Sequence, residues 1–342
     1  MNRNCRRGAT RISIGRMRLS VLDQSPVISG LGARRAIEET LALARRVEEL
    51  GYHRYWLAEH HAIAALADPC PEVLLARLGA ETKRMRVGTG GVLLPYYSAF
   101  RVAETFRMLE ALYPGRIDLG IGRAPGGTQR TAHAVGGGAM PDARDFPEQV
   151  WQLREHFRGS LPDDHPFKRV RLQPEVETAP EIWLLGSSEY SGALAAQLGL
   201  AFAFAHFINP HGGEAVARAY RENCKGAKPQ VIVCTFAICG DTQADAERLA
   251  APIDLRRLHM ALDIDTPIPT EEEALQHKYS PEERHYVTNQ RARAVIGDAA
   301  RCRRELTEMA TRYEADELMV LTITGDYASR TRSYELLSEA MR

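Results

Sequence analysis

The sequence predicts a single α/β domain folded as a closed (β/α)8 TIM barrel. Short apolar runs typical of strands alternate with amphipathic helical patterns, at a spacing of roughly 30 to 35 residues in the first half, the length of a strand plus a crossover helix. Eight such runs occur in all, which indicates a closed parallel sheet. An open doubly wound sheet is the main alternative. Its glycine-rich dinucleotide fingerprint should follow the first strand, where this chain reads Asp23-Gln24-Ser25-Pro26 instead.

The repeat is clearest in the first half of the chain. Apolar residues at helical spacing from Ile37 to Val47 predict the first crossover helix, and Gly51 is a natural residue just past its end. A second helical pattern ends before Pro114-Gly115. The eight predicted strands begin near Leu19, Arg54, Arg86 and Arg116 and then cover residues 182–185, 200–207, 231–239 and 318–324.

Two stretches depart from the repeat, one after strand four and one after strand seven. The first, residues 122–147, is rich in glycine, and the second, residues 255–291, is long, charged and contains proline. Barrel active sites lie at the C-terminal ends of the strands, so both insertions are candidate lids. For residues 255–291 we expect a mobile insertion; a surface role without any part in catalysis is the alternative. The barrel itself is predicted over residues 18–342.

Composition excludes several classes of function. Lys and Arg number 44 and so do Asp and Glu, which removes the electrostatic case for nucleic acid or an anionic membrane as the main partner. The longest apolar runs stop well short of the roughly 20 residues that span a bilayer. Six scattered cysteines without a Cys-x-x-Cys pair predict buried, reduced thiols in a cytoplasmic protein. Residues 1–17 are arginine-rich without a signal-peptide pattern, so we expect a disordered extension; Met17 is the alternative start.

A cluster of ionisable side chains, Glu59-His60-His61, follows the second predicted strand. This is where barrel enzymes keep catalytic groups, although a strand cap and a solvated histidine would also explain it. A metal site using His60, His61 and His206 is a further alternative. The barrel metallohydrolases to which we would compare it carry a His-x-His pair at strand one, where this chain has Asp23-Gln24.

Glycine and hydroxyl residues follow three later strands. Gly90-Gly91 interrupt a buried strand, which indicates either a flat ring packed on bare backbone or a simple bulge. Arg123 ends strand four, and a guanidinium there suits a phosphate, although a surface salt bridge is the commoner fate of such a residue. Three serines open a helix after strand five and offer hydroxyls and free backbone amides to an anion, whereas ordinary capping needs only one. These serines are Ser187, Ser188 and Ser191.

These motifs occur in an order that resembles the bacterial-luciferase-like flavin monooxygenase family. The resemblance rests on the Glu59-His60-His61 cluster, VGTGGVLLP at residues 87–95, GRIDLGIGR at residues 115–123 and AAQLG at residues 195–199. It runs from about residue 18 to the C-terminus, including residues 330–337. Luminescent members carry a reactive cysteine where this chain has Gly122, so light emission is not implied.

The resemblance implies an enzyme that takes reduced FMN from a separate NAD(P)H-dependent flavin reductase and reacts with O2. It implies a flavin 4a-hydroperoxide that oxygenates a small organic substrate, with His60 as the catalytic residue. Arg123, Ser188 and Ser191 match positions that contact the flavin phosphate, and Gly90-Gly91 match a non-prolyl cis peptide bond beneath the flavin ring. A homodimer formed through helices at residues 72–81 and 102–112 is also implied. The alternatives are a deazaflavin-dependent dehydrogenase on the same barrel and a non-catalytic flavin-binding relative.

Overall fold

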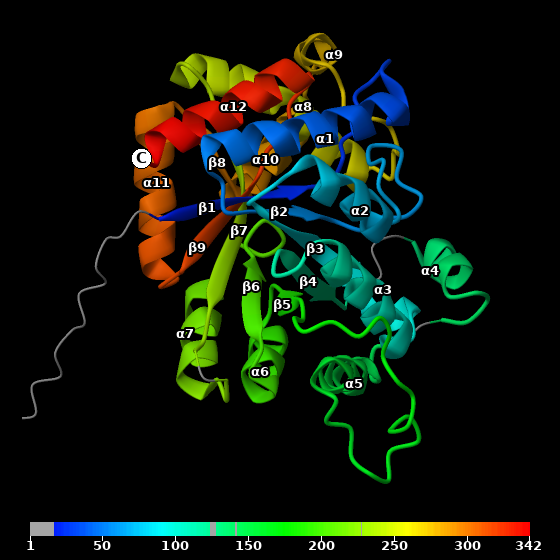
Figure 1. Ribbon diagram of the computed structural model, residues 1–342. Helices are drawn as coiled ribbons and strands as arrows, with labels where there is room; N and C mark the ends of the chain where they lie inside the picture. The colour runs from blue at the N-terminus through cyan, green and yellow to red at the C-terminus, as the bar shows by residue number, and fades with distance from the viewer. Residues whose placement is uncertain (1–16, 124–127, 141, 227) are drawn as a thin grey trace, which may run out of the picture.

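Eight parallel strands close into a barrel in the computed structural model, which describes residues 17–123, 128–140, 142–226 and 228–342 (Figure 1). The strands pair in chain order, β6 pairs with β7, and the last barrel strand, β9, joins β7 to β1. The predicted closed barrel is therefore confirmed. Apart from Met17, the predicted N-terminal extension lies outside the described residues. The barrel strands are β1 (Arg18–Asp23), β2 (Arg54–Leu57), β3 (Arg86–Leu93), β4 (Ile117–Gly122), β5 (Glu181–Gly186), β6 (Ala201–Ala205), β7 (Val231–Cys239) and β9 (Glu317–Leu321).

Helices surround the barrel on its outer side, as Figure 1 shows. The first of them ends as predicted, because Gly51 adopts the left-handed conformation with φ of 86° and its N–H caps the helix. A short 3₁₀ turn, η1 (Leu94–Tyr96), follows β3. The helices against the barrel are α1 (Gly32–Leu50), α2 (Pro71–Glu81), α3 (Ala99–Leu112), α5 (Phe146–Arg158), α6 (Glu189–Leu198), α7 (Gly213–Asn223), α8 (Gln243–Ala261), α11 (Ala299–Arg312) and α12 (Tyr327–Ala340).

A ninth strand, β8 (Ala294–Gly297), was not predicted. It pairs with Phe236 to Cys239, the half of β7 that extends past the pairing with β6. Since β8 pairs with β7 alone, it lies beside the closed barrel and leaves the eight-stranded ring intact. Four residues are too few to show a strand pattern in the sequence.

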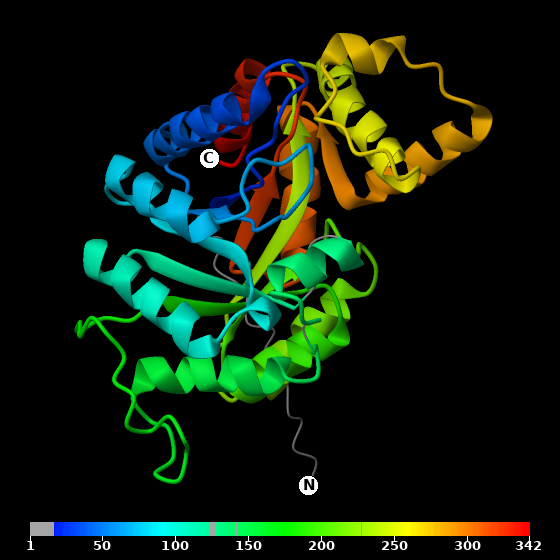
Figure 2. The same ribbon diagram turned by 90° about the vertical axis from the view of Figure 1, so that its right-hand side faces the viewer.

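The segment expected as a long insertion after β7 is largely helical. Its first residues, from Leu255 on, belong to α8, and α9 (Glu271–Gln276), α10 (Pro281–Gln290) and the 3₁₀ turn η2 (Arg291–Arg293) follow. Buried Leu255, Leu258 and Ala274 give it a small apolar core. Figure 2 shows α8, α9 and α10, in yellow to orange, standing out to one side of the barrel.

The connection after β4 holds α4 (Gln129–Val135) and then α5. A further irregular segment, residues 159–180, separates α5 from β5 and was not predicted. Its four prolines, which cannot donate backbone hydrogen bonds, account for the lack of a helix or strand there. They are Pro162, Pro166, Pro174 and Pro180.

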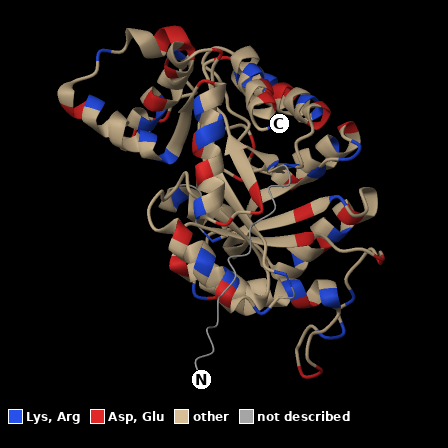
Figure 3. Cartoon of the chain, turned by 90° about the vertical axis from the view of Figure 1, so that its left-hand side faces the viewer, with Lys and Arg blue, Asp and Glu red and all other residues tan. Residues whose placement is uncertain are grey.

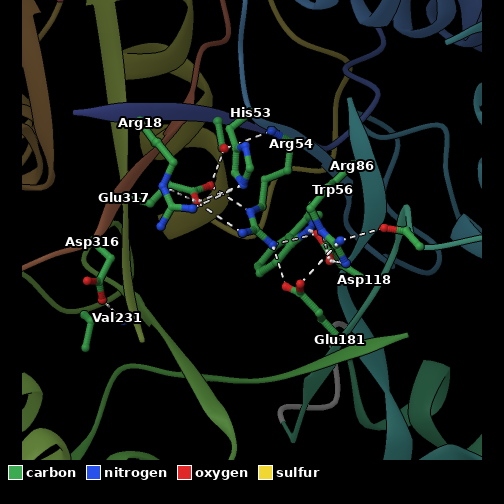
Figure 4. A network of polar contacts seen from close by, with 12 residues as sticks. Arg18, His53, Arg54, Trp56, Arg86, Asp118, Glu181, Val231, Asp316 and Glu317 are labelled. Carbon is green, nitrogen blue, oxygen red and sulfur yellow. Dashed lines mark hydrogen bonds and ion pairs between the residues drawn. The ribbon is translucent and has the colours of Figure 1, made fainter. Parts of the chain in front are cut away.

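The N-terminal end of the barrel is held by buried ion pairs around Arg54 (Figure 4). Its guanidinium donates to Glu317 Oε1 at 2.8 Å and Oε2 at 3.2 Å, and to Asp118 Oδ2 at 2.8 Å. Asp118 also accepts hydrogen bonds from the Arg86 guanidinium at 2.6 Å and from Trp56 Nε1 at 2.8 Å. Because each buried charge has a close partner, the network avoids the cost of an uncompensated charge.

The distribution of surface charge agrees with the composition, whereas the exposure of the cysteines differs from the expectation in one respect. Figure 3 shows acidic and basic residues interspersed along the outer helices. No helix among the described residues is long and apolar enough to cross a membrane. The five described cysteines are free thiols, but Cys70 is exposed and Cys224 partly so. The expectation of uniformly buried thiols was therefore wrong, since Cys70 lies in the loop just before α2.

Candidate active site

A cavity of about 370 Å³ opens at the C-terminal ends of the barrel strands. Residues from β1 to β7 and from β9 contribute to its wall, which is mostly apolar and aromatic, a composition typical of small-molecule sites. Its polar groups gather at two places, the end of β2 and the start of α6. All seven candidate site residues named from the sequence line it: His60, Gly90, Gly91, Arg123, Ser187, Ser188 and Ser191.

Bare backbone lines the wall where β3 passes. The peptide bond between Gly90 and Gly91 is cis, which confirms the expectation. A Cβ atom on Gly91 would lie 2.7 Å from the Gly120 carbonyl oxygen, and one on Gly90 would lie 2.8 Å from Leu22 Cδ1. The register with β4 also shifts between Thr89 and Val92, which is the bulge that the sequence indicated as one of two alternatives.

His60 lies just past the end of β2, and its backbone N–H donates to the Asp68 carbonyl oxygen at 3.2 Å. Its Nδ1 atom is buried and has no hydrogen-bond partner among the described residues. Burial lowers the pKa of His60 to about 4, so its imidazole is neutral at pH 7. A neutral imidazole can hold a proton on one nitrogen and accept one on the other.

The two neighbours of His60 in the cluster have their own partners. Glu59 is buried and accepts hydrogen bonds from the Leu93 N–H at 2.8 Å and from the Tyr97 hydroxyl at 2.6 Å. His61 Nε2 lies 2.7 Å from the same carboxylate. Glu59 thus ties the end of β2 to the turn after β3, and within this cluster it is His60 Nδ1 that is buried without a hydrogen bond.

The metal alternative is not supported by the placement of the histidines. His206, beyond the end of β6, is buried with its Nδ1 3.3 Å from the Thr235 hydroxyl and its ring against Tyr313. No group of three or more His, Cys, Asp or Glu residues that could hold a metal ion occurs in the described part of the chain.

The start of α6 forms the second polar part of the cavity. Ser188 caps the helix, its N–H donates to Ser191 Oγ at 3.3 Å, and the Ser191 hydroxyl donates to the Ser188 carbonyl at 2.8 Å. Capping therefore accounts for the Ser191 hydroxyl. Exposed Arg123 lies with its guanidinium carbon 4.6 Å from the centre of the Tyr190 ring. This guanidinium and the amides of the first helical turn together favour an anion.

Several lining residues were missed from the sequence. Phe207 directly follows β6, so its position at a strand end was a signal that could have identified it. Tyr190 stands inside the serine-rich segment that was singled out. Trp56 lies within β2, and no local pattern marks which face of a fully buried strand points into a cavity.

Comparison with known proteins agrees with this geometry. The model of the family described as luciferase-like monooxygenase matches residues 17–315. A luciferase-like monooxygenase of Escherichia coli K12 is 39% identical over 321 residues, covering 93% of this chain and 95% of the relative. The N-acetyl-S-alkylcysteine monooxygenase of Bacillus subtilis 168 is 34% identical over 330 residues, covering 95% and 98%. The solved structure of apo-MsnO8 superposes with a TM-score of 0.88 at 38% identity, covering 95% and 98%. The chain therefore belongs to the luciferase-like family of flavin-dependent monooxygenases.

Proposed function

We propose that the protein is an FMN-dependent monooxygenase that takes reduced flavin from a separate NAD(P)H-dependent reductase and uses O2 to oxygenate a small organic substrate. The observation that carries this proposal is the presence, in one cavity, of a neutral His60 with a free Nδ1, a bare glycine wall and a helix start that favours an anion. Family membership supports the flavin and the monooxygenase class.

The residues of the cavity fit a flavin mononucleotide. Gly90 and Gly91 would present backbone without side chains to a flat ring. Glycine is favoured at both positions, because a Cβ atom on either would clash with a neighbouring residue. Arg123, Ser187 and Ser188 would hold the phosphate with the first turn of α6. Ser191 would act indirectly, by fixing the loop through its bond to the Ser188 carbonyl.

Reduced FMN, when bound, supplies the two electrons that activate O2. The protein contributes a proton-handling group and a dry environment. His60 is neutral because of its burial, so its free Nδ1 can accept a proton or donate one according to the tautomer, and no competing hydrogen bond holds it. Apolar Leu22, Trp56 and Phe207 exclude water from the same space.

The helical segment after β7 would complete this enclosure as a lid. Its Ile268 exchanges two backbone hydrogen bonds of 2.8 Å with Val27 and Ser29, in the loop after β1. Its Asp265 accepts from the Ala64 N–H at 3.1 Å, in the loop after β2. Both loops leave the C-terminal ends of strands, so the segment borders the side of the barrel on which the cavity opens.

The proposal is tested by mixing the protein with reduced FMN without oxygen and then adding O2 rapidly. We expect the return of the oxidised-flavin absorbance to be slower than for free FMN, and an added substrate to suppress release of hydrogen peroxide. If reduced FMN oxidises as fast with the protein as it does free in solution, the proposal fails. Deazaflavin-dependent hydride transfer then becomes the reaction to test.

We also propose a homodimer through α2 and α3. These helices expose three large apolar side chains, Val73, Met108 and Leu112, each more than half accessible. Large apolar side chains exposed on two adjacent helices are available to such an interface. Sedimentation analysis should show a dimer, and Met108→Glu should shift it toward monomer; a monomeric wild-type protein would contradict the assignment.

A further inference from the structure

A buried guanidinium whose two terminal nitrogens make no hydrogen bond lies one aromatic ring away from the residues that line the cavity, and the function proposed above does not use it. It belongs to Arg257 in α8, which is only 8% exposed. Neither Nη1 nor Nη2 makes a hydrogen bond to the described residues. A buried cation in this state is costly, so a protein that retains one has a use for its free donors.

The position of Arg257 relates it to the mouth of the cavity. Its guanidinium carbon lies 4.5 Å from the centre of the Phe236 ring in β7. Phe236 shares a strand face with Cys234, which lines the cavity, and is two residues nearer the C-terminal end of β7. The Phe236 ring also packs edge-on against Phe207, another lining residue, with ring centres 5.8 Å apart. Stacking on Phe236 uses the face of the guanidinium and leaves the N–H groups at its edge available.

Nearby acidic groups do not satisfy Arg257. Asp254 Oδ1, which makes no hydrogen bond of its own, forms an ion pair with Arg257 Nη1 at 3.8 Å, beyond hydrogen-bond distance. Asp254 Oδ2 accepts from the Arg291 guanidinium at 2.6 and 2.9 Å. Arg291 and Arg293 add positive charge around the site, and Glu247, which pairs with Arg291, offsets part of it. Burial, together with these two arginines, lowers the pKa of Arg257 to about 10 despite Asp254, so the group remains charged at pH 7. The local balance is therefore a surplus of positive charge facing an aromatic wall.

We propose that Arg257 binds the carboxylate of a substrate whose apolar part enters the cavity past Phe207 and Phe236. This inference rests on the function proposed above and names the class of its substrate: small organic acids with an apolar portion. A carboxylate matches the two free N–H donors in a bidentate arrangement and neutralises the surplus charge.

The test compares the binding affinities of carboxylates and of their uncharged carboxamides by titration calorimetry. The protein is supplemented with oxidised FMN, so no turnover takes place. The probes are hexanoate, 4-phenylbutanoate and N-acetyl-S-methylcysteine. In the wild-type protein at least one carboxylate should bind roughly tenfold or more tightly than its amide, the range expected of charged hydrogen bonds. Arg257→Met should bring that ratio close to one, and Arg257→Lys should retain part of it because it keeps the charge without the planar fork.

Arg256→Met is the matched control. Arg256 is the neighbouring buried arginine on α8, but its guanidinium donates to the Ile264 carbonyl at 3.2 Å and to Asp265 at 3.4 Å. This variant should keep the carboxylate preference and melt at a lower temperature. Arg257→Met should melt at the wild-type temperature or higher, because it removes a buried charge whose terminal nitrogens make no hydrogen bond and whose ion pair with Asp254 is long.

Three results would overturn the assignment. The first is a wild-type protein that prefers none of the three carboxylates, and the second is an Arg257→Met variant that keeps the preference. The third is a marked loss of stability in Arg257→Met, which would give the residue a structural role. The protein could show the carboxylate preference in calorimetry and yet fail to slow the oxidation of reduced FMN. That combination would contradict the proposed monooxygenase function and leave the role of Arg257 standing.

Discussion

The two ends of the barrel differ in how completely the buried groups nearest the cavity are paired, although the C-terminal end also holds one well-partnered buried ion pair, Asp23–Arg330 at 2.6 Å. At the N-terminal end, Arg54 has two carboxylate partners within hydrogen-bond distance and stacks over Trp183 at 4.7 Å. At the C-terminal end, His60 and Arg257 keep buried nitrogens without partners in the described residues. The N-terminal end therefore pairs the buried charge of Arg54 fully, whereas the C-terminal end leaves His60 Nδ1 and the two Arg257 Nη atoms available to a ligand.

The largest effect on stability should come from removing Arg54 from the ion-pair network at the N-terminal end of the barrel. Arg54→Met leaves Asp118 and Glu317 without their shared cation, although Arg86 still pairs with Asp118. We expect the free energy of unfolding to fall by about 3–5 kcal/mol. Chemical denaturation measures this directly. A loss below about 1 kcal/mol would contradict the contrast between the two ends.

His60→Ala should have a large effect on activity and little on stability. Loss of a positioned proton-handling group typically lowers the rate by about 10²-fold or more. Oxygenated product formed per reduced FMN should fall and hydrogen peroxide should rise. His61→Gln is the control, and it should lose less than tenfold, because His61 bonds to Glu59 and does not line the cavity. Equal losses in both variants would remove the special role of His60.

Gly91→Ala should disturb both flavin binding and stability. The new Cβ atom would lie 2.7 Å from the Gly120 carbonyl oxygen. This oxygen belongs to the backbone of β4, so it can move away only if the strand itself shifts. Overpacking of this kind costs about 1–3 kcal/mol. Gly122→Ala serves as the matched control, since its Cβ would meet no atom closer than 3.6 Å. Thermal unfolding and FMN titration of both variants should separate them; identical behaviour would show that the wall at Gly91 tolerates a side chain.

The smallest effect is a dependence of stability on pH. Burial lowers the pKa of His206 to about 4, below the ordinary value of 6.5. The unfolded chain therefore binds more protons between pH 6.5 and 4, and stability falls as the pH falls through this window. His206 alone should contribute about 1 kcal/mol of loss between pH 6.5 and 5.5. Denaturation of His206→Gln should show a shallower slope, and an unchanged slope would contradict the assignment.

The barrel was predictable because its signals are local. Buried strands and helix ends such as Gly51 and Pro114-Gly115 recur at the spacing of a βα unit, and the strand ends then bring His60, Gly91 and Ser188 to one cavity. The short strand β8 and the helical nature of residues 255–291 were not predictable. β8 exists only because β7 is long enough to pair with it, and charged α10 has no buried face to mark it.

The charge networks could not be read from the sequence at all. Arg54 and Glu317 stand 263 residues apart, and only the closure of the barrel brings them together. The Arg257 guanidinium lies 3.8 Å from Asp254 Oδ1 and hydrogen-bonds nothing, while Arg291, 37 residues from Asp254, bonds the other oxygen. Such pairings are properties of the packed chain, so a sequence pattern marks each arginine as an ordinary member of a helix or strand.

The most direct test of a flavin site at the open end is anaerobic binding of reduced FMN compared with reduced riboflavin, which lacks the phosphate. We predict that FMN binds more tightly in the wild-type protein and that Arg123→Gln reduces this difference. Equal binding of the two flavins, or none of either, would contradict the site assembled from Gly90, Gly91, Arg123 and the start of α6.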